Sequence, residues 1–214
     1  VIFTSDNGPW LSYGDHAGTT GGLREGKGTT FEGGIRVPMV ARLPGVIPDG
    51  SVCDQPCMTL DLLPTIAQLT GTSANLGTLE IDGRDIGALL RGEPGATSPH
   101  EALFFWYHKG DLEAMRAGRW KLHFPHRYRT MAGREPGNNG IPGKYDYSAR
   151  TELALYDLNE DPNETHDLSE THPEVVARLT KLAEAKRLEL GDRLQGVDGS
   201  SIREPGRIEM KDAP

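Results

Sequence analysis

The residues best suited to chemistry lie in two loops near the start of the chain. Asp6 and Asn7 come one residue, Ser5, after the apolar stretch 1–4, which has a β-branched start. A carboxylate and an amide oxygen where a buried strand meets its loop favour a ligand site. Lys27 lies in the glycine-rich stretch 21–28, whose flexible backbone can bring it back to these oxygens. Opposite charges at one place predict a metal and an anion in one pocket.

The Asp-Asn-Gly sequence has two interpretations. On its own it is first of all a turn, because Asn-Gly readily adopts positive φ. A carboxylate next to an amide oxygen also suits a hard cation such as calcium, which takes about six to eight oxygen ligands. Two residues cannot hold calcium tightly, so further ligands must come from elsewhere.

Residues 21–29 nearly match the phosphate-binding loop G-x-x-x-x-G-K-[ST]. Three features oppose a nucleotide site. Residue 28 is Gly where Ser or Thr should bind magnesium, the segment before Gly21 reads as a loop, and residues 31–38 do not resemble the start of a helix.

Four motifs of the chain closely resemble the carboxyl-terminal half of the sulfatase family, the arylsulfatase-type enzymes of the alkaline-phosphatase-like superfamily. They are SDNGP at 5–9, GLREGKGTTFEGGIRVP at 22–38, DLLPTIAQLTG at 61–71 and LYDLNEDPNETHDL at 155–168. The resemblance covers most of the chain. It implies a sulfuric ester hydrolase that is periplasmic or secreted and acts on a small-molecule or saccharide sulfate ester.

The resemblance also assigns roles to the two loops. It implies that Asp6 and Asn7 are calcium ligands and that the Lys27 ammonium contacts a sulfate oxygen, offsetting the charge that develops as the S–O bond breaks. His16, in a polar loop expected to face the same pocket, is a candidate substrate contact, with a merely solvated histidine as the alternative.

The resemblance to the sulfatases includes three further charged residues of this segment. Arg24 matches the family pattern, but we expect Arg24, Glu32 and Arg36 to form a structural ion-pair cluster.

Sulfatases use a formylglycine made within C-x-P-x-R or S-x-P-x-R as the nucleophile, and the 214 residues contain neither motif. Cys53 is followed by Asp54-Gln55-Pro56, one residue out of register, and Cys57 precedes no proline. We expect both cysteines to be ordinary buried or half-buried thiols. Because the chain begins at Val1 inside a strand pattern, we expect a fragment that is inactive alone, with the nucleophile and the other calcium ligands upstream.

The formal net charge of −8 argues against general nucleic-acid affinity, which needs clustered Lys and Arg. An anionic substrate must therefore be attracted by a local basic patch. The long basic loop 125–150 is a candidate subsite for a sulfated sugar or aryl group, with a solvated surface as the alternative. No apolar run approaches the roughly 20 residues that a membrane-spanning helix needs.

Periodicity and the resemblance together predict an α/β fold in three parts. Residues 1–98 are the expected carboxyl-terminal part of the sulfatase catalytic domain, 99–193 a small antiparallel-sheet subdomain with a carboxyl-terminal helix, and 194–214 a polar, poorly ordered tail. The Gly/Pro/Ser-rich stretch 92–99 is the predicted boundary.

Each part has its predicted elements. In the first part we expect strands at 1–4 and 35–43, a helix at 60–70 that is capped by Asp61 and covers the sheet, and a short helix near 86–90. In the second part we expect strands at 102–107, 112–118, 119–124 and 153–158, and a helix from Pro173 to a stop at Gly191.

Two other functions stay open at this point. A phosphate or phosphonate monoester hydrolase of the same superfamily is one, because tetrahedral anions of similar size fit one cradle. A non-catalytic anion- or carbohydrate-binding module is the other. The nucleophile and the metal count would distinguish the first, and calcium-dependent binding of a sulfated ligand without turnover would support the second.

Overall fold

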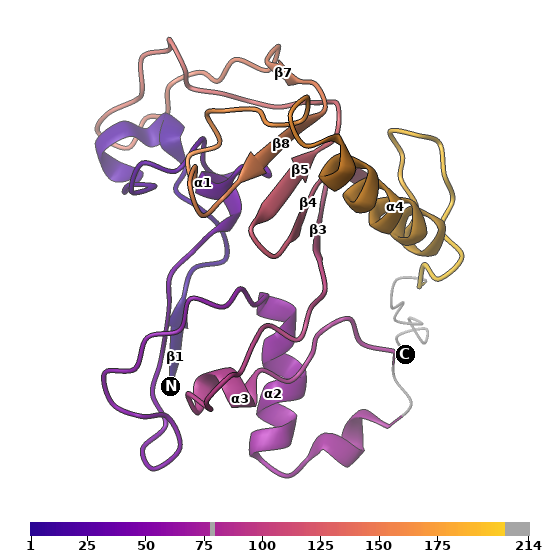
Figure 1. Ribbon diagram of the computed structural model, residues 1–214. Helices are drawn as coiled ribbons and strands as arrows, with labels where there is room; N and C mark the ends of the chain where they lie inside the picture. Colours follow the sequence, from indigo (N-terminus) through magenta and orange to yellow (C-terminus); the bar gives the residue numbers. More distant parts are fainter. Residues whose placement is uncertain (78–79, 204–214) are drawn as a thin grey trace, which may run out of the picture.

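The computed structural model describes residues 1–77 and 80–203. In Figure 1 a four-stranded sheet with helix α4 forms the upper part, and helices α2 and α3 lie in the lower part near strand β1. The elements in chain order are β1 (Ile2–Thr4), η1 (Leu11–His16), α1 (Glu32–Ile35), β2 (Met39–Ala41), η2 (Thr59–Asp61), α2 (Leu62–Leu69), η3 (Ser73–Leu76), α3 (Gly87–Leu90), β3 (Leu103–Tyr107), β4 (Asp111–Ala117), β5 (Trp120–His123), β6 (His126–Arg127), β7 (Arg150–Thr151), β8 (Ala154–Asp157) and α4 (Pro173–Leu190).

The four-stranded sheet is antiparallel, with the strand order β3-β4-β5-β8. All four predicted strands form, and each end lies within one residue of its predicted position. Because side chains alternate between the faces of a strand, Leu122 of β5 points to one face while its neighbours Lys121 and His123 point to the other. Leu122 packs with Leu155 and with Leu179 of α4 in the main core. The sheet therefore has an apolar face toward α4 and a polar face on the opposite side, where Figure 1 shows α1.

The first predicted strand forms, but it is not buried. β1 pairs antiparallel with β2, and the pair exposes 88% of Val1, 74% of Phe3 and 65% of Val40. The strand predicted over 35–43 is shortened to Met39–Ala41. A helical turn occupies Glu32–Ile35, closed by the Arg36 N–H to the Glu32 carbonyl, and Pro38 has no N–H to donate to a partner strand.

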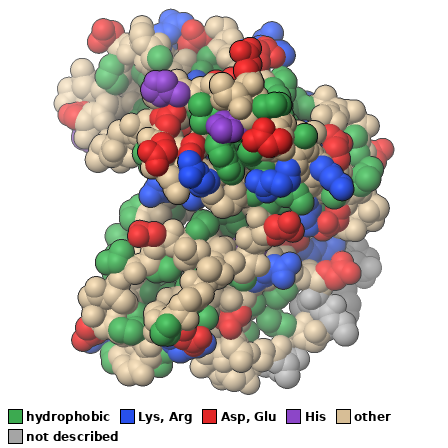
Figure 2. Space-filling model, viewed as in Figure 1, with side chains coloured by type: hydrophobic (Ala, Val, Ile, Leu, Met, Phe, Trp, Pro, Cys, Tyr) green, Lys and Arg blue, Asp and Glu red, His purple; other side chains and the backbone are tan. Residues whose placement is uncertain are grey.

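Helix α2 forms within the predicted range, but it does not pack closely against the β1–β2 sheet of the first part, which it was expected to cover. It packs against η2, η3 and α3, and its Leu63 and Ile66 side chains are 56% and 48% exposed. Figure 2 shows hydrophobic side chains on the surface of this lower part and a recess between it and the upper part. Asp61 does not cap α2 with its side chain, because its carboxylate accepts the N–H groups of Met58 and Arg84 instead.

Segment 125–150 is more regular than the expected loop. β6 pairs with β7 at its two ends, and the backbones of Thr130 and Asp146 exchange hydrogen bonds of 2.8 and 3.0 Å. The segment is therefore a long, twisted hairpin that closes back on itself.

Helix α4 begins at Pro173 and ends at Leu190, with Gly191 as the residue that stops it, as predicted. The chain beyond it is ordered at first, because the buried Asp192 carboxylate accepts the Arg187 Nε–H at 2.8 Å. Residues 204–214 of the predicted tail lie outside the described residues. Across 1–77 and 80–203, no helix combines the length and the apolar character that crossing a membrane requires. The three-part division of the chain stays a prediction.

Candidate functional site

The Asp-Asn loop and the glycine loop meet, as the sequence predicted. The Gly8 N–H donates to the Gly34 carbonyl at 2.9 Å, and the Lys27 N–H donates to the Pro9 carbonyl at 2.9 Å. A Cβ on Gly8 would lie 1.8 Å from the Gly33 oxygen, so only glycine permits this approach. The two hydrogen bonds place Lys27 next to the end of β1.

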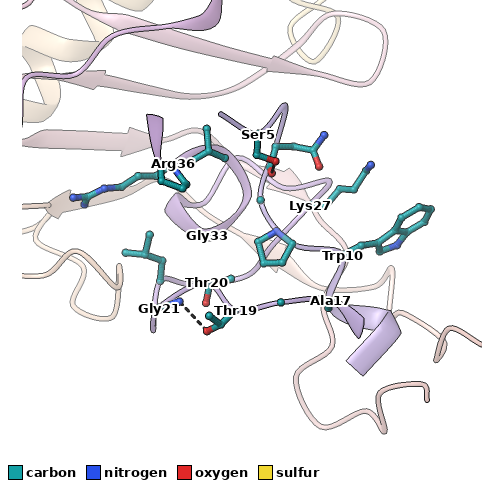
Figure 3. A pocket seen from close by; sticks show the side chains of 16 residues that line it. Ser5, Trp10, Ala17, Thr19, Thr20, Gly21, Lys27, Gly33 and Arg36 are labelled. Carbon is teal, nitrogen blue, oxygen red and sulfur yellow. Dashed lines mark hydrogen bonds between the residues drawn. The ribbon is translucent and has the colours of Figure 1, made fainter. Parts of the chain in front are cut away.

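A groove of about 650 Å³ opens between these loops (Figure 3). Two cations, Lys27 and Arg36, line it, and among the described residues that line it there is no carboxylate. Lys27 is half-buried, and its Nζ lies 4.8 Å from the centre of the Trp10 ring, a cation–π distance. Figure 3 shows Lys27 between Ser5 and Trp10, while Arg36 extends on the other side. The groove is therefore suited to an anion.

The predicted metal ligands lie at the edge of this groove. Asn7 is half-buried and lines it, whereas Asp6 is exposed and does not. Two neighbouring hard oxygen donors fit the chemistry of a calcium site. No cluster of three or more His, Cys, Asp or Glu side chains suited to a metal occurs in 1–77 and 80–203, and the calcium role of Asp6 and Asn7 stays a prediction.

His16 lies outside the groove that Lys27 lines. Its side chain is 56% exposed, its Nε2 lies 3.7 Å from Asp15 Oδ1, and it does not line the groove, although the next residue, Ala17, does. The substrate contact of His16 stays a prediction.

Cys53 and Cys57 are both free thiols, as predicted, but only Cys57 is half-buried; Cys53 is exposed, so the prediction of its burial was wrong. Burial, followed by the neighbouring Asp61 carboxylate, raises the pKa of the Cys57 thiol. Its nucleophilic thiolate form is therefore disfavoured.

A network of buried charged side chains, which the sequence did not predict, lies beneath the glycine loop. Lys121 Nζ lies 3.0 Å from both Glu32 Oε1 and Glu164 Oε1, and all three side chains are almost fully buried. The second Glu164 oxygen accepts the Glu32 N–H at 2.6 Å, and His123 Nε2 lies 2.8 Å from Glu164 Oε1. This network joins the glycine loop to the polar face of the sheet.

The network shifts the pKa values of its members. Burial alone would raise the pKa of Glu164, but the Lys121 charge and the His123 hydrogen bond bring it down to about 2. Burial lowers the pKa of His123 to about 4, against the opposing effect of Glu164. Glu164 is thus a carboxylate and His123 a neutral imidazole at pH 7. The only signal in the sequence was the alternation of Lys121 and His123 with Leu122 along one strand.

A second acid lies on the same polar face. Thr30 Oγ1 donates to Glu113 Oε2 at 3.1 Å, and His126 Nε2 lies 3.5 Å from that oxygen. Burial raises the pKa of Glu113 to about 7; the Thr30 hydrogen bond opposes this shift, and the Asp111 charge adds to it. Glu113 is therefore partly protonated near neutral pH.

The expected ion-pair cluster forms only in part. Arg36 Nη1 lies 4.0 Å from Glu32 Oε2, as predicted. Arg24 does not pair with Glu32: its guanidinium lies 4.0 Å from the centre of the Phe31 ring and donates to the Glu164 carbonyl at 2.8 Å. The buried partner of Glu32 is Lys121.

Comparisons with known proteins identify the family. A sulfatase family model matches residues 1–72, and a model for the C-terminal region of aryl-sulfatase matches residues 98–200. The chain is 38% identical to arylsulfatase A of Bos taurus over 194 residues, which are 89% of this chain and 37% of that protein. The chain belongs to the sulfatase family.

Other sulfatases support the same family and fold. The chain is 34% identical to steryl-sulfatase of Mus musculus over 207 residues, 89% of this chain and 33% of that protein. The crystal structure of the PsFucS1 sulfatase from Pseudoalteromonas sp. matches with a TM-score of 0.68 at 30% identity, over 86% of this chain and 36% of that one. The predicted family and α/β sulfatase fold are confirmed, and the chain spans about a third of the length of these sulfatases.

Proposed function

We propose that the protein is a sulfuric ester hydrolase of the arylsulfatase type and that the groove binds the sulfate group. The observation that carries this proposal is the placement of Lys27 and Arg36 in one groove beside Asn7, with no carboxylate among the described lining residues. Membership of the sulfatase family supports the same reaction class.

Lys27 has the central role in this proposal. Its Nζ donates to a sulfate oxygen and offsets the negative charge that develops as the S–O bond breaks. Half-burial beside the Trp10 ring keeps part of the water away, so the ammonium charge acts more strongly than it would in bulk solvent. Arg36 adds a second positive charge on the other side of the groove.

Asp6 and Asn7 would hold calcium together with ligands from outside the 214 residues. Calcium bound there would polarise a sulfate oxygen as a Lewis acid. The nucleophile would be a formylglycine that is also outside these residues. On this proposal the 214 residues complete an active site and cannot turn over substrate by themselves.

The exposed apolar side chains of the lower part fit the same proposal. Val1, Phe3 and Val40 of the β1–β2 pair and Leu63 and Ile66 of α2 lie exposed. Apolar surface of this kind marks an interface. We assign it to the remainder of the catalytic domain, since the matched sulfatases are much longer than this chain.

The substrate we propose is a small-molecule or saccharide sulfate ester in the periplasm or outside the cell, as in the enzymes that the motifs resemble. His16, exposed next to the groove wall, would contact the part of the ester that extends out of the groove.

The experiment that tests the function measures the hydrolysis of an aryl sulfate, with calcium present, by the full-length protein that contains these 214 residues and by its Lys27→Ala variant. This full-length protein is called the intact protein below. We expect kcat/KM to fall by about 100- to 1,000-fold in the variant, as on the loss of one charge-stabilising donor. Lys181→Ala, which removes an exposed lysine of α4, is the matched control and should leave kcat/KM unchanged. Near-normal kcat/KM in Lys27→Ala would contradict the proposed role.

The same assay separates the two alternatives. An aryl phosphate run in parallel tests the phosphatase alternative, which a higher kcat/KM for the phosphate would favour. Calcium-dependent binding of a sulfated sugar without any turnover by the intact protein would favour the binding module instead.

A further inference from the structure

The backbone of Lys27 is held on both sides of its Cα. Its N–H donates to the Pro9 carbonyl at 2.9 Å, on the side of the Asp-Asn loop. Its carbonyl accepts the Nε–H of Arg129 at 2.9 Å and a second hydrogen bond from Nη2 of the same side chain. Arg129 comes from the hairpin 125–150 of the carboxyl-terminal part. Two segments distant in sequence therefore fix one residue of the groove.

Gly28 permits this contact. Its φ is +86°, a conformation that residues with a Cβ rarely adopt, and a Cβ placed there would lie 2.3 Å from Arg129 Cζ. The phosphate-binding loop would need Ser or Thr at this position. Glycine is required here instead because the Arg129 guanidinium occupies the space beside it.

Arg129 differs from other arginines of its hairpin. Arg134 pairs with Asp146 at 3.1 Å and Arg150 pairs with Glu152 at 2.6 Å, both at the surface. Within the described residues, no carboxylate oxygen lies within 4.0 Å of Arg129, which is half-buried. The planar fork of arginine suits such a fixed, two-donor contact.

The guanidinium is itself held in place by an aromatic ring. Arg129 Cζ lies 4.5 Å from the centre of the Tyr145 ring, and the Tyr145 hydroxyl accepts the Ser12 N–H at 3.3 Å. Ser12 belongs to η1, which directly follows Trp10, and Trp10 lines the groove. The hydrogen bond between Ser12 and Tyr145 therefore also ties the hairpin to the wall of the groove. The Arg129 side chain is thus oriented toward the Lys27 carbonyl before any ligand arrives.

We propose that Arg129 is a positioning residue that fixes the Lys27 peptide so that the Lys27 ammonium is held at the groove. This inference rests on the proposed function, since it gives Arg129 its effect through Lys27. Without Arg129 the peptide between Lys27 and Gly28 can rotate, and the Nζ is displaced from the sulfate oxygen. A displacement of about 1 Å at a reacting group lowers the rate on the order of 100-fold.

The test is a double-mutant cycle in the intact protein, with aryl sulfate hydrolysis as the readout. We expect Arg129→Ala to lower kcat/KM on the order of 100-fold, mainly through kcat. The same substitution in the Lys27→Ala background should change kcat/KM by less than about threefold, because residues that act as a unit are not additive. Additive losses in the double variant would overturn the proposal, because a merely structural role lowers activity whether or not Lys27 is present.

Two further variants keep the test decisive. Arg129→Lys retains the charge but offers a single nitrogen in place of the two-nitrogen fork, and we expect a loss of about tenfold that is again absent in the Lys27→Ala background. Arg129→Lys takes the place of Arg129→Ala in the double-mutant cycle if Arg129→Ala does not fold. Arg178→Ala removes an exposed arginine of α4, outside the hairpin, and should leave kcat/KM unchanged.

The outcomes also separate this inference from the proposed function. If Lys27→Ala keeps its kcat/KM, the proposed role of Lys27 in binding the sulfate is wrong. If Lys27→Ala loses activity while Arg129→Ala and Arg129→Lys keep it, only the role of Arg129 fails.

Discussion

The Nζ of Lys121 lies 3.0 Å from Oε1 of Glu164, and both side chains are fully buried. Lys121 belongs to β5, whereas Glu164 lies in the loop between β8 and α4, and the same carboxylate accepts the Glu32 N–H of α1, just after the glycine loop. One ion pair therefore joins three segments. A buried pair of this kind adds little net stability over an apolar pair, but removing one partner leaves an uncompensated charge.

Lys121→Met tests the importance of this pair. The substitution keeps the length of the side chain but removes the fully buried cation from Glu164 and Glu32, of which Glu32 keeps Arg116 Nη1 at 3.7 Å. We expect the free energy of unfolding of the intact protein to fall by about 3–5 kcal/mol, measured by urea unfolding at pH 7. The matched control is Lys181→Met on the exposed face of α4. A decrease in the free energy of unfolding no larger than that of the control would show that the network rearranges without a loss of stability.

Glu113→Gln tests the raised pKa on the polar face. The folded pKa of Glu113, about 7, lies above the ordinary value of 4.5, so the folded state binds more protons than the unfolded state between these two values. The stability that Glu113 contributes is therefore present below pH 4.5 and is lost as the pH rises to 7. Because Gln cannot ionise, the Glu113→Gln variant does not lose this stability as the pH rises.

We expect the free energy of unfolding of Glu113→Gln to rise relative to that of the unmodified protein by up to roughly 3 kcal/mol between pH 4.5 and 8. Chemical unfolding at a series of pH values measures this difference. Glu101→Gln, at an exposed position, serves as the control and should show no such trend. A pH-independent difference for Glu113→Gln would mean that the folded pKa of Glu113 is ordinary.

Gly28→Ala tests the approach of Arg129 to the glycine loop. The new methyl group displaces the guanidinium from the Lys27 carbonyl, so we expect kcat/KM for an aryl sulfate to fall on the order of 100-fold, as in Arg129→Ala. The control is Gly118→Ala in the β4–β5 turn, where φ is +58° but no atom lies within 4 Å of the added Cβ. That control carries only the conformational cost of about 1–2 kcal/mol and should keep its kcat/KM. Equal activities of the two variants would contradict the steric argument.

Asp6→Ala tests the proposed calcium site. A carboxylate that helps to hold calcium lowers the concentration needed for half-saturation, so its loss should raise that concentration on the order of 100-fold. The measurement is the rise of Tm with added calcium in the chelator-treated intact protein. Asp49→Ala, at an exposed turn position, is the control. Identical calcium dependence in the two variants would remove Asp6 from the site.

Local patterns in the sequence predicted much of the fold. The strands from 102 to 158 and helix α4 were predicted to within about one residue, because the alternation and the helical periodicity of apolar residues are properties of a few neighbouring positions. The same reasoning located the loops that carry Asp6 and Lys27. Local patterns could not show whether an apolar segment is covered: the strand at 1–4, which was expected to be buried, is exposed, and so are Leu63 and Ile66 of the helix at 60–70.

The sequence by itself determined the family, the antiparallel sheet with its helix, and the loops in which a cation and oxygen donors meet. Only the tertiary structure decided which side chains hold these loops. Lys121 reaches Glu164, and Arg129 reaches Lys27 from a hairpin about a hundred positions away, while His16 stays outside the groove. Such contacts depend on how the polar face of a sheet and a distant loop come together in space, and no periodicity along the chain records that.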